Sequence, residues 1–204
     1  MLISEWIQQS RKIISVGPNF KAFRAQRGIF HQEPPTLSLK SPESLTTALD
    51  IYLSPQMPEF FCEVEMAIVI GQDVKHVAEK DVPSVVAGYA ISNDITASTH
   101  FESGRFKMYD QTTPIGELVQ LTDPGDVQLE MWVNGECIQR DNTKEMMFSA
   151  HWLVAHVSDI MTLRAGDILL AGTPANPKIC RTGDIIEMRS PQLGSIRHTL
   201  HLGT

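Results

Sequence analysis

Residues 62–71 read Cys-Glu-Val-Glu-Met-Ala-Ile-Val-Ile-Gly, so two acidic residues stand inside a short apolar run that ends at a glycine. A run of this length, rich in branched side chains, is more typical of a strand than of a helix. Side chains at positions i and i+2 of a strand share one face, so Glu63 and Glu65 are expected to point the same way. Their burial would require a cation or hydrogen-bond donors, because neighbouring carboxylates repel each other.

The acidic pair allows two interpretations. On a solvated edge strand both glutamates would face water, while Cys62, Val64 and Met66 would face the core. In a buried strand the pair would suit a hard divalent cation. Asp94 lies at the end of a second predicted strand, and although an Asp there can simply cap the next turn of the chain, three carboxylates on apolar strands are what Mg²⁺ requires. Together the three acids favour metal binding.

Length and composition limit the remaining possibilities. A chain of 204 residues is long enough for one sizeable core, and no apolar run approaches the ~20 residues that span a bilayer. The formal charge of −7 without clustered Lys or Arg argues against a nucleic-acid partner. Three widely spaced cysteines suit reduced thiols, and residues 1–7 lack the pattern of a secretory signal, so we expect a cytoplasmic protein without membrane association.

Local signals predict a β-rich chain with few helices. Asn134-Gly135 lies between the alternating segments 128–133 and 136–139, which predicts a hairpin with a type I′ turn. Ser149 is a good N-cap for a helix through Met161, with Leu153, Val157 and Ile160 at core spacing. Gly-Asp turns before two further apolar segments indicate strand entries in a barrel or sandwich.

Two loop segments carry candidate ligand-binding groups. Gly172 and Thr173 follow a predicted strand, and their backbone N–H groups and hydroxyl could hold an anion. Lys107 lies in the loop-like segment 104–120, where a lysine is usually solvated. Only its association with the acids would make it part of a site.

Several short motifs recur here in a particular order and spacing: Glu63-Val64-Glu65 before Ile70-Gly71, Gly88-Tyr89 before Asn93-Asp94, Lys107 and Asp110 before Pro114-Ile115-Gly116, and Gly172-Thr173-Pro174. In this order they resemble the fumarylacetoacetate hydrolase family. The resemblance extends from about Val16 to the C-terminus, which indicates an N-terminal extension over residues 1–15 and a catalytic domain over residues 16–204.

The resemblance implies a mixed, β-rich α+β fold, the β-sandwich roll of that family's C-terminal domain, and a homodimer. It implies that Glu63, Glu65 and Asp94 bind Mg²⁺ or Mn²⁺. The implied substrates are small 2-oxo or enol acids, with the metal acting as a Lewis acid on the enolate. Lys107 would then face the same cavity as the acids and contact the substrate.

The chain also departs from the family pattern. Relatives that hydrolyse or decarboxylate usually carry a His and a Glu on a lid, and the aligned positions here hold Phe23 and Gln26, neither of which is a general base. His31 and Glu33 lie near the lid and could form a displaced catalytic pair. An Arg and a Gln that often come after the Asn-Asp motif are replaced by Ser98 and Phe101. Their substrate contacts could come from Arg105 or His100 instead.

Three functional hypotheses remain. The first is a metal-dependent enzyme that hydrolyses or decarboxylates acylpyruvate-type acids with an altered lid base. The second is an isomerase or tautomerase of oxo-enol acids, which needs the metal and Lys107 but no attacking water. The third, motivated by the missing lid pair, is a family member that binds metal and oxo acids without catalysis.

Overall fold

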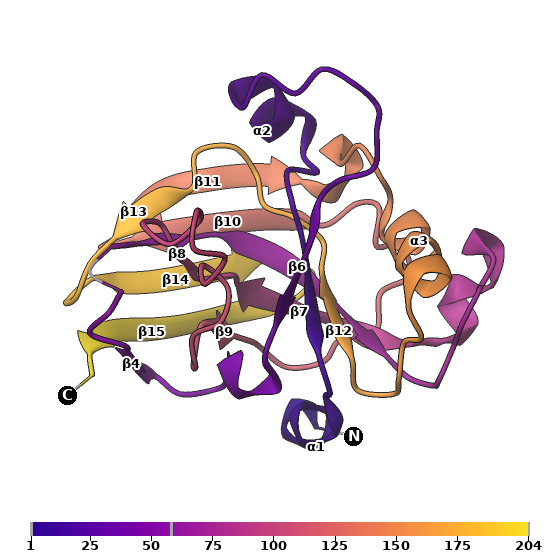
Figure 1. Cartoon of the computed structure of the whole chain (residues 1–204), viewed down its shortest axis with the longest axis horizontal. Coiled ribbons are helices and arrows are strands. Elements are labelled where there is room, and N and C mark those ends of the chain that lie inside the picture. Colours follow the sequence, from indigo (N-terminus) through magenta and orange to yellow (C-terminus); the bar gives the residue numbers. More distant parts are fainter. Residues whose placement is uncertain (1, 58, 204) are drawn as a thin grey trace.

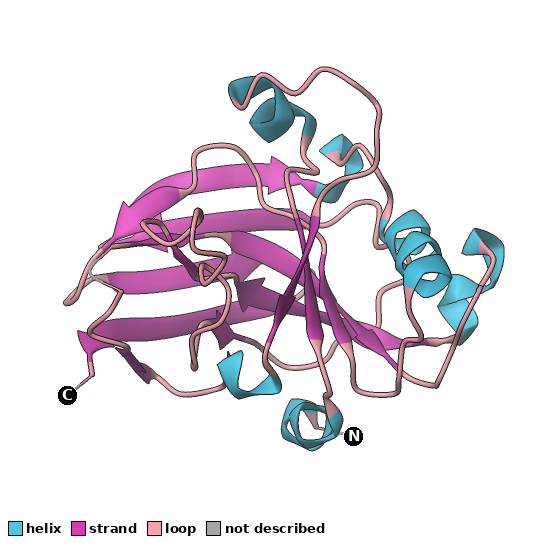
Figure 2. Ribbon diagram, viewed as in Figure 1, coloured by secondary structure: helices cyan, strands magenta, loops and turns pink. Residues whose placement is uncertain are grey.

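The computed structural model describes residues 2–57 and 59–203, and its strands form two large sheets that face each other (Figure 1, Figure 2). The strands are β1 (Ile13–Val16), β2 (Leu37–Lys40), β3 (Leu45–Thr46), β4 (Asp50–Leu53), β5 (Phe60–Cys62), β6 (Val64–Ile70), β7 (Val86–Asn93), β8 (Thr96–Ala97), β9 (Thr113–Pro114), β10 (Gln128–Val133), β11 (Glu136–Asn142), β12 (Ile168–Leu170), β13 (Lys178–Cys180), β14 (Ile185–Ser190) and β15 (Gly194–Leu202). The helices are α1 (Ile3–Gln9), α2 (Lys21–Gln26) and α3 (Ala150–Ile160), with 3₁₀ turns at Pro42–Ser44, Glu79–Ser84 and Thr143–Glu145.

One five-stranded sheet has the order β2-β1-β12-β6-β7, and the other has the order β11-β10-β14-β15-β4. Strand β6 contacts β10, and β7 contacts β14 and β15, so the inner faces of the two sheets enclose the main core. Smaller sheets, β13-β5-β8 and β3-β9, lie beside them. This arrangement confirms the mixed, β-rich α+β fold expected from the sequence.

Strand β6 is an interior strand, with β12 and β7 on its two edges, and it is buried on both faces, since all seven of its residues are buried. The solvated edge strand is therefore excluded. The run 62–71 is also not one continuous strand, since Glu63 separates β5 from β6. Its backbone carbonyl accepts a hydrogen bond from the N–H of Asp94, at 2.9 Å, which brings the third acid to the same point.

Two local predictions are confirmed. The β10–β11 hairpin turns at Asn134 and Gly135, which have φ values of 51° and 85° as a type I′ turn requires. Helix α3 begins after Ser149, whose hydroxyl accepts the N–H of Trp152 at 3.0 Å. The predicted core position of Ile160 is wrong, because its side chain is 54% exposed at the end of the helix.

The last residues of the expected N-terminal extension belong to the sheet, because β1 begins at Ile13. Strand β1 pairs with both β12 and β2, so the expected boundary at residues 15 and 16 falls inside a sheet strand. The outermost residues of the two expected segments, Met1 and Thr204, lie outside the described part of the chain. No helix among residues 2–57 and 59–203 has the length and apolar character needed to cross a membrane.

Candidate active site

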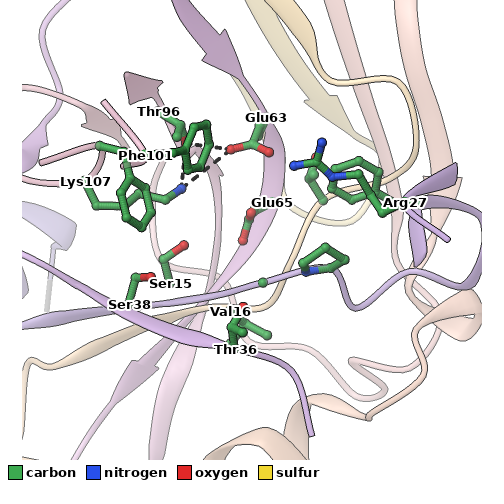
Figure 3. A pocket seen from close by; sticks show the side chains of 15 residues that line it. Ser15, Val16, Arg27, Thr36, Ser38, Glu63, Glu65, Thr96, Phe101 and Lys107 are labelled. Carbon is green, nitrogen blue, oxygen red and sulfur yellow. Dashed lines mark hydrogen bonds and ion pairs between the residues drawn. The ribbon is translucent and has the colours of Figure 1, made fainter. Parts of the chain in front are cut away.

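A cavity of about 330 Å³ opens beside β6, between β1, helix α2 and the loop that carries Phe101 to Lys107 (Figure 3). Glu63, Glu65 and Lys107 line it, as the sequence had suggested. Asp94 lies behind this wall and is fully buried. The structure therefore brings the three acids and the lysine together. Asp94 contacts Lys107 from the protein interior and does not line the cavity itself.

The two glutamates accept hydrogen bonds from neighbouring strands and turns. Glu65 is 2% exposed, and its Oε2 accepts the backbone N–H of Gly172 at 2.7 Å. Oε2 of Glu63 accepts the hydroxyl of Thr96 at 2.7 Å and lies 3.6 Å from Nζ of Lys107. Burial raises the pKa of Glu65 well above its usual value, and the charges of Asp94 and Glu63 raise this pKa further. Burial also raises the pKa of Glu63.

Asp94 is held by cations and a hydroxyl. Its Oδ1 accepts a hydrogen bond from Nζ of Lys40 at 2.6 Å, and its Oδ2 accepts bonds from Lys107 at 2.5 Å and from Ser15 at 2.6 Å. Burial by itself would raise the pKa of Asp94, but the two ammonium groups outweigh it and hold this pKa well below its usual range. Asp94 is therefore the carboxylate that stays ionised most firmly.

The two lysines differ in their position. Lys107 is 8% exposed and lines the cavity, so the usual expectation of a solvated loop lysine is wrong here. Burial would lower the pKa of Lys107, but the charges of Asp94, Glu63 and Glu65 outweigh it and raise this pKa, which keeps the side chain protonated. Burial lowers the pKa of Lys40 to about 8, with Asp94 opposing the change, so Lys40 is also an ammonium at neutral pH.

The oxygen donors near the glutamates, which are carboxylates and hydroxyls, are of the kind that a hard divalent cation prefers, and the ammonium group of Lys107 lies beside them. Burial is the main cause of the raised pKa values of Glu63 and Glu65, and a bound cation would favour the ionised form of both groups. Within residues 2–57 and 59–203, however, no three acidic, histidine or cysteine side chains converge as a complete ligand set. Asp94 faces Lys40 and Lys107 instead, and the set Glu63, Glu65 and Asp94 stays a prediction.

The other predicted site residues are divided between the cavity and the surface. Thr173 lines the cavity, while the N–H of Gly172 is taken by Glu65 and is not directed at a ligand. His31 and Glu33 do not line it: their side chains are 56% and 80% exposed and lie 3.5 Å from each other. The arrangement therefore gives no support to a displaced catalytic pair. Arg105 is also exposed and donates to the hydroxyl of Ser103 at 3.3 Å.

Sequence reasoning missed several residues that the fold brings to the site. Lys40 and Ser15 reach Asp94 from β2 and β1, and Arg27 lines the cavity from the end of α2. Phe101 and Phe106 stack with ring centroids 4.8 Å apart in the opposite wall. The only sequence signal for Lys40 was a charged residue that closes an alternating strand. Arg27 had no signal beyond its place in a short polar helix.

The chain matches the family described as fumarylacetoacetate (FAA) hydrolase C-terminal over residues 12–201. It is 33% identical over 202 residues to a mitochondrial oxaloacetate tautomerase of Rattus norvegicus, covering 91% of this chain and 64% of that protein. It is 32% identical over 185 residues to a mitochondrial oxaloacetate tautomerase of Arabidopsis thaliana, covering 85% of this chain and 83% of that protein.

The chain also resembles proteins of known structure over nearly its whole length. A 5-carboxymethyl-2-hydroxymuconate delta-isomerase from Mycobacterium smegmatis superposes with a TM-score of 0.87 at 30% sequence identity. The match covers 96% of this chain and 80% of that one. The similarity thus includes both large sheets and the strands that carry the acids.

Proposed function

The chain belongs to the fumarylacetoacetate hydrolase family, and on this premise we propose that it interconverts the oxo and enol forms of small 2-oxo acids in the presence of a divalent metal ion. Isomerases and tautomerases occur among its relatives. The choice of this reaction over hydrolysis rests on the side chains that line the cavity of this chain.

The observation that carries the proposal is the nature of these side chains. Among the described residues that line the cavity, those with ionisable side chains are Arg27, Glu63, Glu65 and Lys107. The phenyl ring of Phe23 occupies the lid position where a base is expected, and His31 lies outside. Hydrolysis of a C–C bond needs a base that activates water. Tautomerisation removes a proton from the enol oxygen and returns one to the neighbouring carbon, so it needs stabilisation of the enolate and a carrier for the proton, a role that solvent water can fill.

Charge balance supports an acidic substrate together with a metal. The site and its supporting shell hold three carboxylates, on Glu63, Glu65 and Asp94, and three cationic side chains, on Arg27, Lys40 and Lys107. This set is neutral when every group is ionised. A divalent cation and a dianionic substrate would enter together without leaving net charge in a partly dry pocket, which avoids the large free-energy penalty of burying an unpaired charge.

Glu63, Glu65 and Asp94 would hold the metal, which supplies Lewis-acid polarisation of a substrate oxygen when bound. Lys107 keeps its ammonium group at the cavity wall through hydrogen bonds to Asp94 and to the hydroxyl of Thr96, at 2.5 and 2.6 Å. A fixed ammonium there stabilises the negative charge that develops on an enolate oxygen. The stacked rings of Phe101 and Phe106 form an apolar part of the same cavity wall.

Decarboxylation of a 3-carboxylated oxo acid is the second candidate function, because it also passes through an enolate, that of the shorter acid left when CO₂ departs, and needs no activated water. The arrangement of Lys107, Thr96 and Glu63 serves both reactions equally. The two are separated by the products, since only decarboxylation breaks a C–C bond.

The test is a small substrate panel with Mg²⁺ and with a chelator. The enol absorbance of oxaloacetate, the release of pyruvate from oxaloacetate and the cleavage of acetylpyruvate are followed separately, and a dienol diacid is included for isomerase activity. We expect metal-dependent enol–oxo conversion above the buffer rate and no cleavage of acetylpyruvate. Rapid acetylpyruvate cleavage would contradict the proposal. Binding of oxo acids without turnover of any of them would favour the non-catalytic hypothesis.

A further inference from the structure

Arg27 is a cationic side chain at the cavity that the proposed reaction does not use. It comes directly after the last residue of α2 and lines both the main cavity and an adjoining one of about 260 Å³. Figure 3 shows its guanidinium pointing toward the cavity on the opposite side of Glu63 from Lys107. Among residues 2–57 and 59–203 this guanidinium has no ion-pair or hydrogen-bond partner, and its one specific contact is with the ring of Phe23, 5.6 Å from the centroid.

Helix α2 is fastened in place, so the position of Arg27 is defined by the fold. Gln26 and Asn176 exchange two hydrogen bonds: Nε2 of Gln26 donates to Oδ1 of Asn176 at 3.2 Å, and the backbone N–H of Asn176 donates to Oε1 of Gln26 at 3.1 Å. The buried Arg24 donates to the carbonyls of Pro18 and His31, at 3.1 and 2.5 Å. Gln26 thus attaches the lid helix to the segment after β12, at the position where a base was expected.

Lys107 and Arg27, the two cationic side chains that line the cavity, differ in their ion pairing. Lys107 is already paired with Asp94, whereas the guanidinium of Arg27 has room for an anion. A planar guanidinium that rests on an aromatic ring is well suited to grip a carboxylate through two parallel hydrogen bonds. Since the glutamates lie between the two cations, an oxo acid held at the glutamates would extend toward Arg27 with its far end.

We propose that Arg27 binds the carboxylate at the far end of the substrate and makes the site selective for dicarboxylic over monocarboxylic oxo acids. The inference rests on the proposed function, because it assumes that the oxo-acid end of the substrate is bound at Glu63 and Glu65. It does not depend on which reaction the bound acid undergoes. Binding alone can therefore test it.

The experiment is calorimetry of the full chain with Mg²⁺ and two acids of equal length, 2-oxoglutarate and 2-oxopentanoate, which differ by one terminal carboxylate. The change Arg27→Met keeps an apolar stem over Phe23 and removes the charge. Loss of a charge-assisted pair should weaken 2-oxoglutarate by roughly 10–100-fold and leave 2-oxopentanoate within about twofold. Arg27→Lys should give an intermediate loss, since an ammonium pairs without the planar fork.

Lys21→Met is the matched control, because it removes one positive charge from the same helix at a residue that pairs with Glu145 outside the cavity. It should change neither affinity. Oxaloacetate and 2-oxobutanoate repeat the contrast with a chain one carbon shorter. Urea titration of each variant shows that it is folded.

Equal loss of both acids in Arg27→Met, or no loss of either, would overturn the proposal. So would a wild-type protein that binds neither dicarboxylic acid more tightly than its monocarboxylic match. If the expected selectivity is found but no oxo acid is turned over, the proposed function fails and the role of Arg27 stands. If turnover is found without the selectivity, the proposed function stands and the proposed role of Arg27 fails.

Discussion

Lys40 and Asp94 form an ion pair of 2.6 Å in which both side chains are fully buried, although 54 residues separate them in the chain. The pair holds the carboxylate of Asp94 in position behind the cavity wall. One oxygen of Asp94 is thereby taken by Lys40 of β2, and the second oxygen accepts hydrogen bonds from Lys107 and Ser15.

Replacing Lys40 by Met should destabilise the protein strongly. The change would leave Asp94 with less compensation in a buried position, and breaking one partner of such a pair typically costs roughly 3–5 kcal/mol. The free energy of unfolding from urea titration measures the effect. Lys80→Met, at an exposed residue, is the control and should change that free energy by less than about 0.5 kcal/mol. An equally small effect of Lys40→Met would mean that the pair contributes no net stability.

Replacing Glu65 by Gln should weaken Mg²⁺ binding. The amide oxygen can still accept the N–H of Gly172, so the change removes one negative charge with little change of shape. We expect the affinity measured by calorimetry to fall by more than the roughly 10–100-fold that loss of an outer-shell partner causes. Glu136→Gln, on the exposed edge of the hairpin, is the matched control. Unchanged affinity would exclude Glu65 as a ligand.

Replacing Lys107 by Met should lower turnover by about 10²–10³-fold, since it removes the ammonium that stabilises the enolate oxygen. The same change removes a partner of Asp94, so some loss of stability is expected as well. Steady-state rates must therefore be measured below the unfolding transition of the variant. Full turnover by a folded Lys107→Met would show that the inherited role of this lysine does not apply.

Phe23 and Gln26 allow a lid base to be introduced stepwise. Phe23 lines the main cavity, so Phe23→His should place an imidazole there and raise the cleavage of acetylpyruvate by up to about 10²-fold, the low end for general base catalysis. Gln26→Glu alone should give no gain, because this side chain is directed to Asn176 and the change loses the bond donated by Nε2. A rise in the double variant only would show that the two positions act as a pair. Product analysis separates these outcomes.

His198 should make stability depend on pH. Burial lowers its pKa from 6.5 to about 4, and its Nε2 lies 2.9 Å from the amide nitrogen of Asn93, which requires the neutral ring to accept. Because the folded-state pKa is the lower one, the unfolded chain binds more protons between pH 4 and 6.5, and stability rises with pH across this window.

The contribution of His198 is fully present above about pH 6.5 and is lost as the pH falls through about 4. A difference of this size corresponds to about 3 kcal/mol. The variant His198→Gln retains an acceptor for Asn93 and cannot titrate. Its unfolding free energy should therefore vary less between these pH values than that of the wild type. Parallel pH profiles would show that His198 is not buried as a neutral ring in solution.

The amino-acid sequence by itself determined the features that depend on neighbours in the chain. Asn134-Gly135 specified its hairpin because both residues tolerate positive φ, and Ser149 specified the start of α3 because its side chain satisfies a free N–H. The motifs around Glu63, Glu65, Asp94 and Lys107 indicated the family, and the comparisons confirm it.

The tertiary structure alone decided what surrounds those motifs. The order β2-β1-β12-β6-β7 places Lys40 and Ser15 against Asp94, and the bonds between α2 and the segment after β12 place Arg27 at the cavity. Periodicity reports which face a side chain occupies, but it does not report which distant strand lies opposite. The charge state of a buried group depends on its partner. Strand order and the packing of the lid helix determine which partner lies within reach.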